Sequence, residues 1–245
     1  MRLWFLFGAL VLAEIAYPLV HGRTRAVLVV ATVVAGYLLS VTHAYVTRGA
    51  RTAAALVVVT TGGGLAIEAA GRTTGFPFGD YDYTGALGPR LLGVPLVVPL
   101  AWTWMAWPAW LAAGRLVRRT LPRIGLAGVG LAAWDLFLDP QMVSERYWLW
   151  SDPATALPGV PGVPVSNYLG WLVVAIAMTA LLRVAAGPDP DGPRADAPMY
   201  ALYLWTYASS ILAHAVFLGL PASAAWGALG MGLVAVPLAV RLWRR

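Results

Sequence analysis

Long apolar runs separated by polar connections determine what this chain can fold into. A helix needs roughly twenty apolar residues to cross about 30 Å of hydrocarbon, and such runs lie at 3–20, 26–46, 53–70, 91–113, 124–138, 168–186, 199–220 and 222–242. The fifth run is short, so we expect it to be tilted, broken or extended into its flanks. With 60% hydrophobic and 11% charged residues, the chain is no ordinary soluble domain.

The sequence therefore predicts an all-α integral membrane protein. We expect one polytopic bundle of about eight transmembrane helices, forming a single transmembrane domain over residues 1–245. A polar, partly re-entrant loop is expected at 71–90, between the third and fourth apolar runs.

The arginines indicate how the chain lies in the membrane. All seventeen basic residues are Arg, and twelve fall on the side of the N-terminus if the runs alternate in direction. By the positive-inside rule, this predicts a multi-pass protein of the cell membrane with both termini in the cytoplasm. It places Asp80, Asp82 and Asp139 toward the outer leaflet. Orientation in the bilayer explains the net charge of +6, so no nucleic-acid partner is expected.

Two polar insertions interrupt the apolar pattern. Segment 68–95 contains one Glu, two Asp, two Arg, two Tyr, six Gly and three Pro, and it is longer and more polar than an ordinary connection. The second insertion, 134–140, reads WDLFLDP. These residue types suit a shaped pocket better than a spanning helix. We expect the first insertion to form one wall of an active site and the second to form the other.

Several acidic residues lie where charge is costly. Glu14, Glu68 and Asp135 fall in or at the ends of apolar runs, and ionisable groups at such depth are candidates for function. Asp135 and Asp139 are four residues apart, so a helix places them on one face. Two carboxyl groups this close in a low dielectric do not both ionise readily, so one keeps a proton near neutral pH and suits a general acid. Glu14, one turn before Pro18, is expected to be structural.

Asp135, Asp139 and Glu68 could instead have structural roles. The two aspartates of the second insertion would then cap helix ends or pair with Arg146 or Arg90. Glu68 would form an ion pair with Arg72, four residues further along the helix.

The remaining polar signals are weak. The chain has no cysteine, which excludes disulfides, thiolate metal sites and a Cys nucleophile. His43 and His214 stand alone in apolar runs, and the carboxylate cluster of a Mg²⁺-diphosphate site is missing, so no metal is expected. Segment 187–197, GPDPDGPRADA, predicts a solvated cytoplasmic loop. Its aspartates are expected in solvent: Asp189, Asp191 and Asp196.

Aromatic residues gather around the two insertions and the start of the next run. They are Phe76, Phe78, Tyr81, Tyr83, Tyr147, Trp148, Trp150 and Tyr168. Membrane interfaces are rich in Trp and Tyr, and that generic cause accounts for about half of them or more. Aromatic faces also stabilise a cation without attacking it, and flat rings suit a long conjugated ligand. Both properties fit a polyene substrate.

Three stretches together resemble a known family. They read EAAGRTTGFPFGDYDYTGALGPRLLGVPLVVPLAW, AWDLFLDPQMVSERYWLW and GVPVSNYLGWL. In this order they are similar to the membrane carotenoid hydratases of the carotenoid-biosynthesis protein family, which includes carotenoid 1,2-hydratases and bisanhydrobacterioruberin hydratase. The resemblance covers roughly residues 64–172. One departure is Pro161-Gly162-Val163-Pro164, where relatives tend to have an aromatic residue before the Gly.

The motifs that carry this resemblance fall on both insertions. The family's Glu-x-x-Gly begins at Glu68 and its Gly-x-Pro-Phe-Gly-x-Tyr-x-Tyr begins at Gly75. Its Asp-x-x-x-Asp-Pro element begins at Asp135. Its Trp-x-Trp falls at Trp148, and its Asn-aromatic-x-Gly-Trp element starts at Asn167.

The resemblance implies addition of water across the terminal C1=C2 double bond of an acyclic carotenoid end group, giving a tertiary alcohol without metal or redox cofactor. Asp135 or Asp139 would donate the proton, and Asp80 or Glu68 would position the water. The expected substrate-binding residues are Phe78, Tyr81, Tyr83, Trp148, Trp150, Asn167 and Tyr168. The expected partners are the carotenoid, water and the lipid bilayer, with association with other carotenoid-pathway enzymes as a further expectation.

Two other functions fit the same residues. A carotenoid end-group cyclase of the lycopene type also protonates C2, but it must keep its cation dry, whereas Asp80, Asp82 and Asn167 are expected to be in contact with water. A non-catalytic carotenoid- or lipid-binding membrane protein would keep the aromatic pocket but would not depend on the carboxyl groups. A transporter fits less well, because the polar groups cluster at one face.

Overall fold

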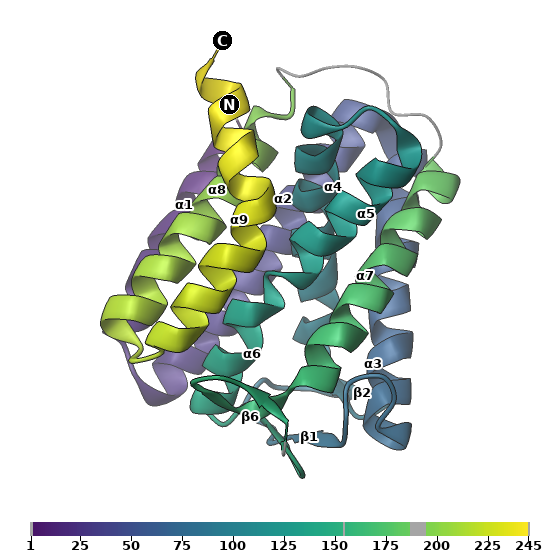
Figure 1. Cartoon of the computed structure of the whole chain (residues 1–245). Coiled ribbons are helices and arrows are strands. Elements are labelled where there is room, and N and C mark those ends of the chain that lie inside the picture. The colour runs from purple at the N-terminus through teal and green to yellow at the C-terminus, as the bar shows by residue number, and fades with distance from the viewer. Residues whose placement is uncertain (1, 154, 187–194, 245) are drawn as a thin grey trace.

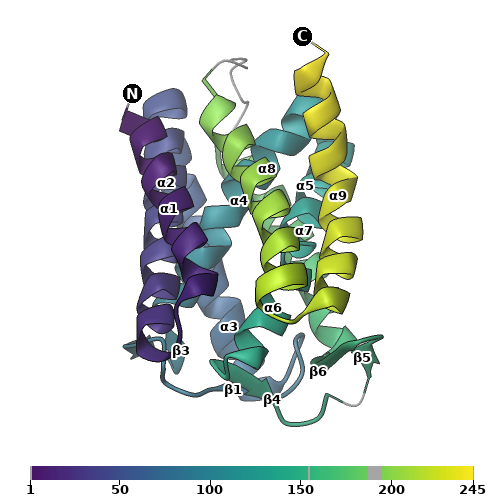
Figure 2. The ribbon, with the colours of Figure 1, turned by 90° about the vertical axis from the view of Figure 1, so that its left-hand side faces the viewer.

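The structure, a computed structural model, describes residues 2–153, 155–186 and 195–244. It is a bundle of helices with both chain termini at one end and short strands at the opposite end (Figures 1 and 2). The helices are α1 (Arg2–Ala16), α2 (Gly22–Leu56), α3 (Gly63–Thr74), α4 (Val97–Leu116), α5 (Thr120–Ala132), α6 (Asp135–Ser144), α7 (Val165–Ala186), α8 (Ala197–Leu212) and α9 (Pro221–Trp243).

Four helical stretches of the described chain are long and apolar enough to cross a membrane. They are Gly22–Thr74, Thr120–Ser144, Val165–Ala186 and Pro221–Trp243. Helix α1 and the 3-10 turn η1 (Tyr17–Leu19) contribute a shorter apolar stretch, Leu3–Leu19. These stretches fit the predicted helical membrane protein, whereas the count of about eight spans remains a prediction.

Gly49 divides the longest of these stretches. Its φ of +84° lies in the left-handed region that favours glycine, and it breaks the helix between the predicted runs 26–46 and 53–70. The chain then passes through a π-helical segment, η2 (Val57–Gly62), into α3. Helix α3 ends beside the strands (Figure 1). The break therefore brings Glu68 of α3 to the same end of the bundle as the polar loop.

Helix α4 runs through the middle of the bundle and contacts α2, α5, α7, α8 and α9. Trp102 and Trp107 on this helix are fully buried. Helix α2 approaches it closely at Gly36, where an added Cβ would lie 2.4 Å from the Cδ1 of Trp104. Small residues at helix contacts allow such close approach in membrane proteins. The tryptophan-rich helix thereby forms a rigid wall behind the polar loop.

The fifth predicted run is broken and extended, as expected from its length. Helix α5 ends at Ala132, a turn follows at Ala133 and Trp134, and α6 begins at Asp135. Together the two helices cover Thr120–Ser144, well beyond the apolar core of the run. Asp135 and Asp139 lie on consecutive turns of α6, and both are buried. The break places both carboxyl groups at the strand end of the bundle.

Short strands pair at the end of the bundle opposite the termini, which is otherwise helical as predicted. Three two-stranded antiparallel sheets form in the connections: β1 (Tyr81–Tyr83) with β4 (Trp148–Trp150), β2 (Arg90–Leu91) with β3 (Val94–Pro95), and β5 (Ala156–Leu157) with β6 (Val160–Pro164). Backbone groups outside helices need hydrogen-bond partners where they are buried, and pairing supplies them. The β1–β4 sheet joins the two polar insertions directly.

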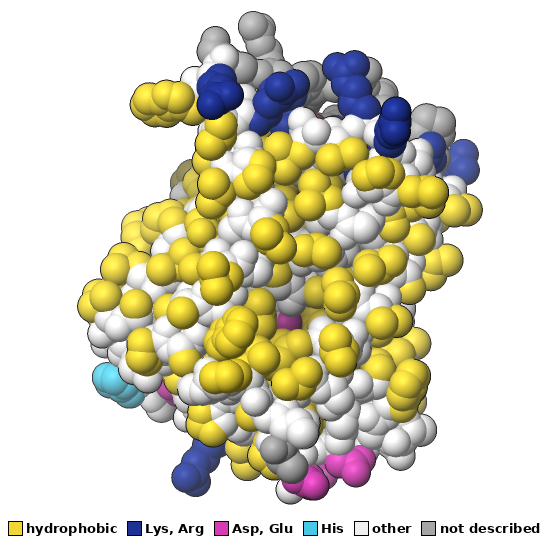
Figure 3. Space-filling model, viewed as in Figure 1, with side chains coloured by type: hydrophobic (Ala, Val, Ile, Leu, Met, Phe, Trp, Pro, Cys, Tyr) yellow, Lys and Arg dark blue, Asp and Glu magenta, His cyan; other side chains and the backbone are white. Residues whose placement is uncertain are grey.

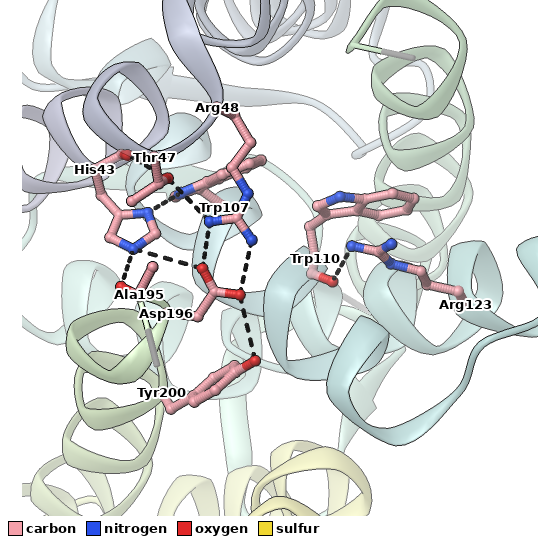
Figure 4. A network of polar contacts seen from close by, with 9 residues as sticks. All are labelled: His43, Thr47, Arg48, Trp107, Trp110, Arg123, Ala195, Asp196 and Tyr200. Atoms are coloured by element: carbon pink, nitrogen blue, oxygen red, sulfur yellow. Dashed lines mark hydrogen bonds and ion pairs between the residues drawn. The ribbon is translucent and has the colours of Figure 1, made fainter. Parts of the chain in front are cut away.

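The opposite end of the bundle holds a buried ion pair (Figure 4). Asp196 is only 5% exposed and pairs with Arg48, whose Nη2 lies 2.7 Å from its Oδ2. The Tyr200 hydroxyl donates to the same carboxyl group at 3.4 Å. The prediction that Asp196 is solvated is therefore wrong, because Arg48 of a distant helix compensates its charge. Asp189 and Asp191 of the predicted loop lie outside the described residues.

Charged side chains are distributed unevenly between the two ends. In the view of Figure 3, most arginines gather over the end that holds the termini, and acidic side chains lie at the strand end. This agrees with the arginine bias read from the sequence. Which end faces the cytoplasm remains a prediction.

Candidate active site

A small cavity lies at the strand end, between the two polar insertions. Its volume is about 50 Å³. The polar residues that line it are Glu68, Asp139 and Asn167, and its aromatic lining comes from Phe78, Tyr81, Tyr83, Trp102, Trp148, Trp150 and Trp171. Both insertions therefore contribute residues to the lining of one cavity.

Glu68 is held by three neutral donors. The hydroxyls of Tyr81 and Tyr83 donate to its Oε2 at 2.5 and 2.8 Å, and the Trp102 indole N–H donates to its Oε1 at 3.0 Å. The alternative of an ion pair with Arg72 is wrong, because Arg72 instead pairs with the exposed Asp82 at 2.9 Å. Glu68 is thus a buried carboxyl group in an uncharged setting.

The turn after α3 explains how the tyrosines reach Glu68. Gly75 ends the helix with a left-handed φ of +73°, and its N–H bonds to the Gly71 carbonyl oxygen at 2.7 Å. The chain then folds back under the helix into β1. Alternation along this strand buries Tyr81 and Tyr83 and leaves Asp82 exposed.

Strand β4 presents its aromatic residues to the same cavity. Trp150 pairs with Tyr81 and Trp148 with Tyr83 in the antiparallel register. The ring centroids of these pairs lie 5.5 and 5.6 Å apart, within the range of favourable aromatic contact. The predicted lining residue Phe78 is also buried beside this sheet. These rings form a continuous aromatic surface next to the carboxyl groups.

Asp135 and Asp139 are linked through Asn167 of α7. The Asn167 Nδ2 donates to Oδ2 of both residues, at 2.8 Å for Asp135. The Trp148 indole N–H donates to Asp139 Oδ1 at 3.0 Å. Asp135 Oδ1 is buried without a hydrogen-bond partner among the described residues. Asp139 faces the cavity, and Asp135 lies behind it, joined through the amide.

The electrostatic setting limits how many of the three carboxyl groups are ionised at once. Ionised carboxyl groups are costly to bury without a compensating cation, and the donors around Glu68, Asp135 and Asp139 are neutral. Burial, together with the nearby Glu68 carboxyl, raises the pKa of Tyr81 and Tyr83 far above the usual range. Both hydroxyls therefore remain hydrogen-bond donors.

Two predicted site residues do not join this group. Asp80 is exposed and does not line the cavity, so the structure does not bring it together with Glu68 and Asp139. Its position just before β1 leaves it on the solvent side of the turn. Tyr168 does not line the cavity either, and its buried hydroxyl has no partner among the described residues. Asn167 is 1% exposed, contrary to the expectation of contact with water.

Sequence reasoning missed the role of two tryptophans. Trp102 and Trp171 stack with ring centroids 3.7 Å apart and an interplanar angle of 12°. Both line the cavity, and Trp102 also binds Glu68. Trp171 belongs to the motif that starts at Asn167, whereas Trp102 lies among several tryptophans of one apolar run. Trp102 is 34 residues after Glu68, and the contact between them becomes visible only when α4 packs against α3 in the structure.

Comparison with known proteins agrees with the motifs. A relative from Haloarcula japonica, described as bisanhydrobacterioruberin hydratase, is 33% identical over 133 residues, covering 52% of this chain and 43% of the relative. The alignment thus spans less than half of that relative's length. Comparison with solved structures finds no match. The model of the carotenoid biosynthesis protein family matches residues 26–236, a range that contains every residue lining the cavity. The chain therefore belongs to the carotenoid biosynthesis protein family.

Proposed function

We propose that this protein is a carotenoid hydratase that adds water across the terminal C1=C2 double bond of an acyclic carotenoid end group. The observation that carries the proposal is the presence of Glu68 and Asp139 in one small cavity lined by aromatic rings. The hydratase description of the aligned relative supports the same reaction class. The reaction needs an acid, a base and a surface that tolerates a cation, and this cavity contains candidates for each.

The Asp135–Asp139 pair is the proposed proton donor. Asp139 faces the cavity, and its carboxylic acid would transfer a proton to C2, where the electron pair of the double bond forms the new C–H bond. The positive charge then lies on C1, which is tertiary. Asp135 and Asn167 would help to hold the negative charge left on Asp139, through the shared amide donor.

Glu68 is the proposed acceptor for the water proton, and it would be the ionised member of the three carboxyl groups, because the three donors on its oxygens favour its charged form. Water attacks C1 through an oxygen lone pair, and the resulting oxonium group loses one proton to a carboxylate, which yields the tertiary alcohol. Return of that proton to the aspartate pair restores the starting state, so the net change is addition of one water. The tyrosine hydroxyls and the Trp102 indole N–H fix the orientation of Glu68.

The aromatic lining would stabilise the cation before water captures it. Ring faces attract a cation by about 0.5–2 kcal/mol each, more when the site is desolvated. Tyr81, Tyr83 and Trp148 lie beside the carboxyl groups and present their rings to the cavity. Their pairing across β1 and β4 keeps the rings in place while the charge develops.

The proposed setting is the cell membrane, with the chain passing through it several times and both termini in the cytoplasm. This orientation rests on the arginines near the termini. The cavity would then lie near the outer face, where water is available to a carotenoid about as long as the 30 Å hydrocarbon core. Association with other enzymes that act on the same pigments is part of this proposal.

Labelled water tests the reaction directly. Purified protein in lipid nanodiscs would be given an acyclic carotenoid such as lycopene in isotopically labelled water, and the products analysed by mass spectrometry. Hydration predicts a tertiary alcohol with oxygen from the solvent. An unchanged mass with a new ring would identify a cyclase, and oxygen derived from O₂ would rule out hydration. An unmodified pigment that still binds the protein would favour a non-catalytic binder.

A further inference from the structure

The cavity at the carboxyl groups lies next to a second one. We call the first the site cavity and the second, of about 110 Å³, the middle cavity. The two share a wall of four apolar side chains from α2 and α6: Val29, Val33, Leu138 and Met142. Because these four side chains line both cavities, a change in their rotamers would join the two spaces.

The middle cavity continues toward the surface of the bundle. A third space of about 290 Å³, the mouth cavity, shares Glu14, Ser209 and Ala213 with the middle cavity. It lies between α1 and the end of α8 with the following π-helical segment η3 (Ala213–Phe217). Its rim residues are largely exposed: Ile15, Leu19, Leu212 and Phe217. Exposed apolar side chains on the outside of a membrane protein are suited to contact with lipid tails.

Rings and apolar side chains form most of this series of cavities. Trp104, Trp134 and Phe137 line the middle cavity, and Trp205 lines the mouth cavity. Flat rings of this kind suit a conjugated hydrocarbon. The site cavity, at about 50 Å³, has room for water and a chain end but not for a long molecule.

We propose that the three cavities form one lateral passage that holds the polyene chain of an acyclic carotenoid. Its end group would lie at Asp139, its chain would pass through the middle cavity, and the remainder would extend between α1 and α8 into the bilayer. The inference rests on the proposed function, since it supplies the route by which a long apolar substrate reaches the carboxyl groups. The lipid-facing opening admits such a substrate directly from the membrane.

Two unsatisfied donors in the middle cavity point to an occupant. The Trp104 indole N–H and the Thr206 hydroxyl are buried and have no hydrogen-bond partner among the described residues. Both residues line the middle cavity. The π electrons of a polyene accept weak hydrogen bonds from such donors. Ordered water would also satisfy them, so the experiment must separate a polyene from water.

Glu14 lies at the junction of the middle and mouth cavities. It lines both of them and accepts a hydrogen bond from the Trp205 indole N–H, which links α1 to α8. This link keeps the two helices together beside the opening. The structural role expected for Glu14 from the sequence is thus a positioning role at the passage.

The absence of cysteine makes a labelling experiment direct. Ser209→Cys places a thiol on the wall shared by the middle and mouth cavities. Val216→Cys, on the same helical run, places one at a lipid-facing position that is 65% exposed and lines none of the three cavities. Each variant in nanodiscs would be treated with a membrane-permeable maleimide, with and without lycopene, and the labelling rate measured.

A polyene bound in the passage should protect the thiol of Ser209→Cys, but not that of Val216→Cys, from the maleimide. With lycopene at about ten times its dissociation constant, labelling of Ser209→Cys should slow about tenfold, because the accessible fraction falls with occupancy, while that of Val216→Cys stays unchanged. Equal rates for Ser209→Cys with and without lycopene would overturn the proposal and favour a water-filled cavity. This readout needs no hydration, so protection without product formation would contradict the hydratase and keep the passage.

A second variant tests the passage during turnover. Ala213→Phe would fill the junction that a long chain occupies throughout the reaction, whereas a short isoprenoid with the same terminal alkene needs only to pass it. We expect activity on lycopene to fall at least about tenfold relative to the short substrate, equivalent to about 1.4 kcal/mol. An equal effect on both substrates would contradict the passage. Val216→Phe is the matched control and should alter neither.

Discussion

Asp135 and Asp139 accept hydrogen bonds from the same atom, the Nδ2 of Asn167. One amide donor therefore bridges two buried carboxyl groups that stand on consecutive turns of α6. Since only Asp139 lines the site cavity, the two carboxyl groups are not equivalent. This difference allows the acid role to be tested residue by residue.

Asp139→Asn should remove the proposed proton donor while preserving the shape of the side chain. An amide cannot protonate an alkene, so hydration of an acyclic carotenoid should fall by about 10²–10⁴-fold. Asp135→Asn keeps Asp139 in place and should cost less. The measurement is the initial rate of alcohol formation, with carotenoid binding followed by absorbance. Alcohol formation at the wild-type rate in both variants would exclude Asp135 and Asp139 as the proton donor.

Asn167→Ala should weaken the acid without removing it. Loss of a hydrogen bond to a charged group costs about 1.5–3 kcal/mol, which corresponds to a decrease of about tenfold to a hundredfold in rate. The aspartates remain, so some activity should persist. Rates of purified variants over a range of carotenoid concentrations would separate a lower kcat from a higher KM. An unchanged kcat would show that the shared amide has no part in the reaction.

Glu68→Gln tests the proposed proton acceptor against a matched carboxyl group in the same insertion. Glutamine can keep an oxygen acceptor for Tyr81 and Tyr83 but cannot take up a proton, so hydration should fall by about 10²–10⁴-fold. Asp80→Asn is the control, because Asp80 is exposed and lies outside the site cavity. Its activity should stay within about twofold of wild type, as surface substitutions usually do little. A larger loss in Asp80→Asn than in Glu68→Gln would reverse the assignment.

Local spacing in the sequence predicted much of this site. The separation of Asp135 and Asp139 placed both on one helical face, and both are buried together. The alternation of Tyr81 and Tyr83 matches the strand that turns both rings inward. Spacing of two or four residues is local information, and secondary structure converts it directly into a shared direction.

Contacts between distant segments could not be predicted in the same way. Asp196 lies in a Pro-, Gly- and Asp-rich stretch that reads as solvated, yet its partner Arg48 is 148 residues away. In the sequence, Asp80 and Glu68 are equivalent candidates. In the structure Glu68 is buried on α3, whereas Asp80, which follows the turn at Gly75, is exposed. In the sequence, Trp102 cannot be distinguished from the other tryptophans of its apolar run. Its carboxyl partner comes from the packing of α4 against α3. Composition does not carry this information.

The tyrosines that bind Glu68 predict a loss of stability in alkali. Burial and the nearby carboxyl raise the pKa of Tyr81 and Tyr83 well above the ordinary value of 10.0. Above pH 10 the unfolded chain loses these protons while the folded protein keeps them, so the free energy of unfolding falls as pH rises. Their contribution is fully present below pH 10.

Detergent unfolding measured between about pH 8 and pH 11 would test this dependence on tyrosine ionisation. Tyr81→Phe/Tyr83→Phe should flatten the alkaline decline, because phenylalanine has no proton to lose. Tyr45→Phe, at a tyrosine that is 59% exposed, is the matched control and should decline like the wild type. The same slope in all three proteins would contradict the prediction.

The ion pair between Arg48 and Asp196 predicts a stability effect far from the candidate site. Both side chains are nearly buried, so Asp196→Asn removes the negative charge that compensates Arg48 and should cost about 3–5 kcal/mol. The matched control is Asp82→Asn, which breaks an exposed pair with Arg72 and should cost less than about 1 kcal/mol. Thermal unfolding in detergent would compare the two variants.

Because Asp196 lies at the opposite end of the bundle from the site cavity, the surviving folded fraction should hydrate carotenoid at the wild-type rate. Equal midpoints for both variants would mean that the buried pair does not stabilise this end of the bundle.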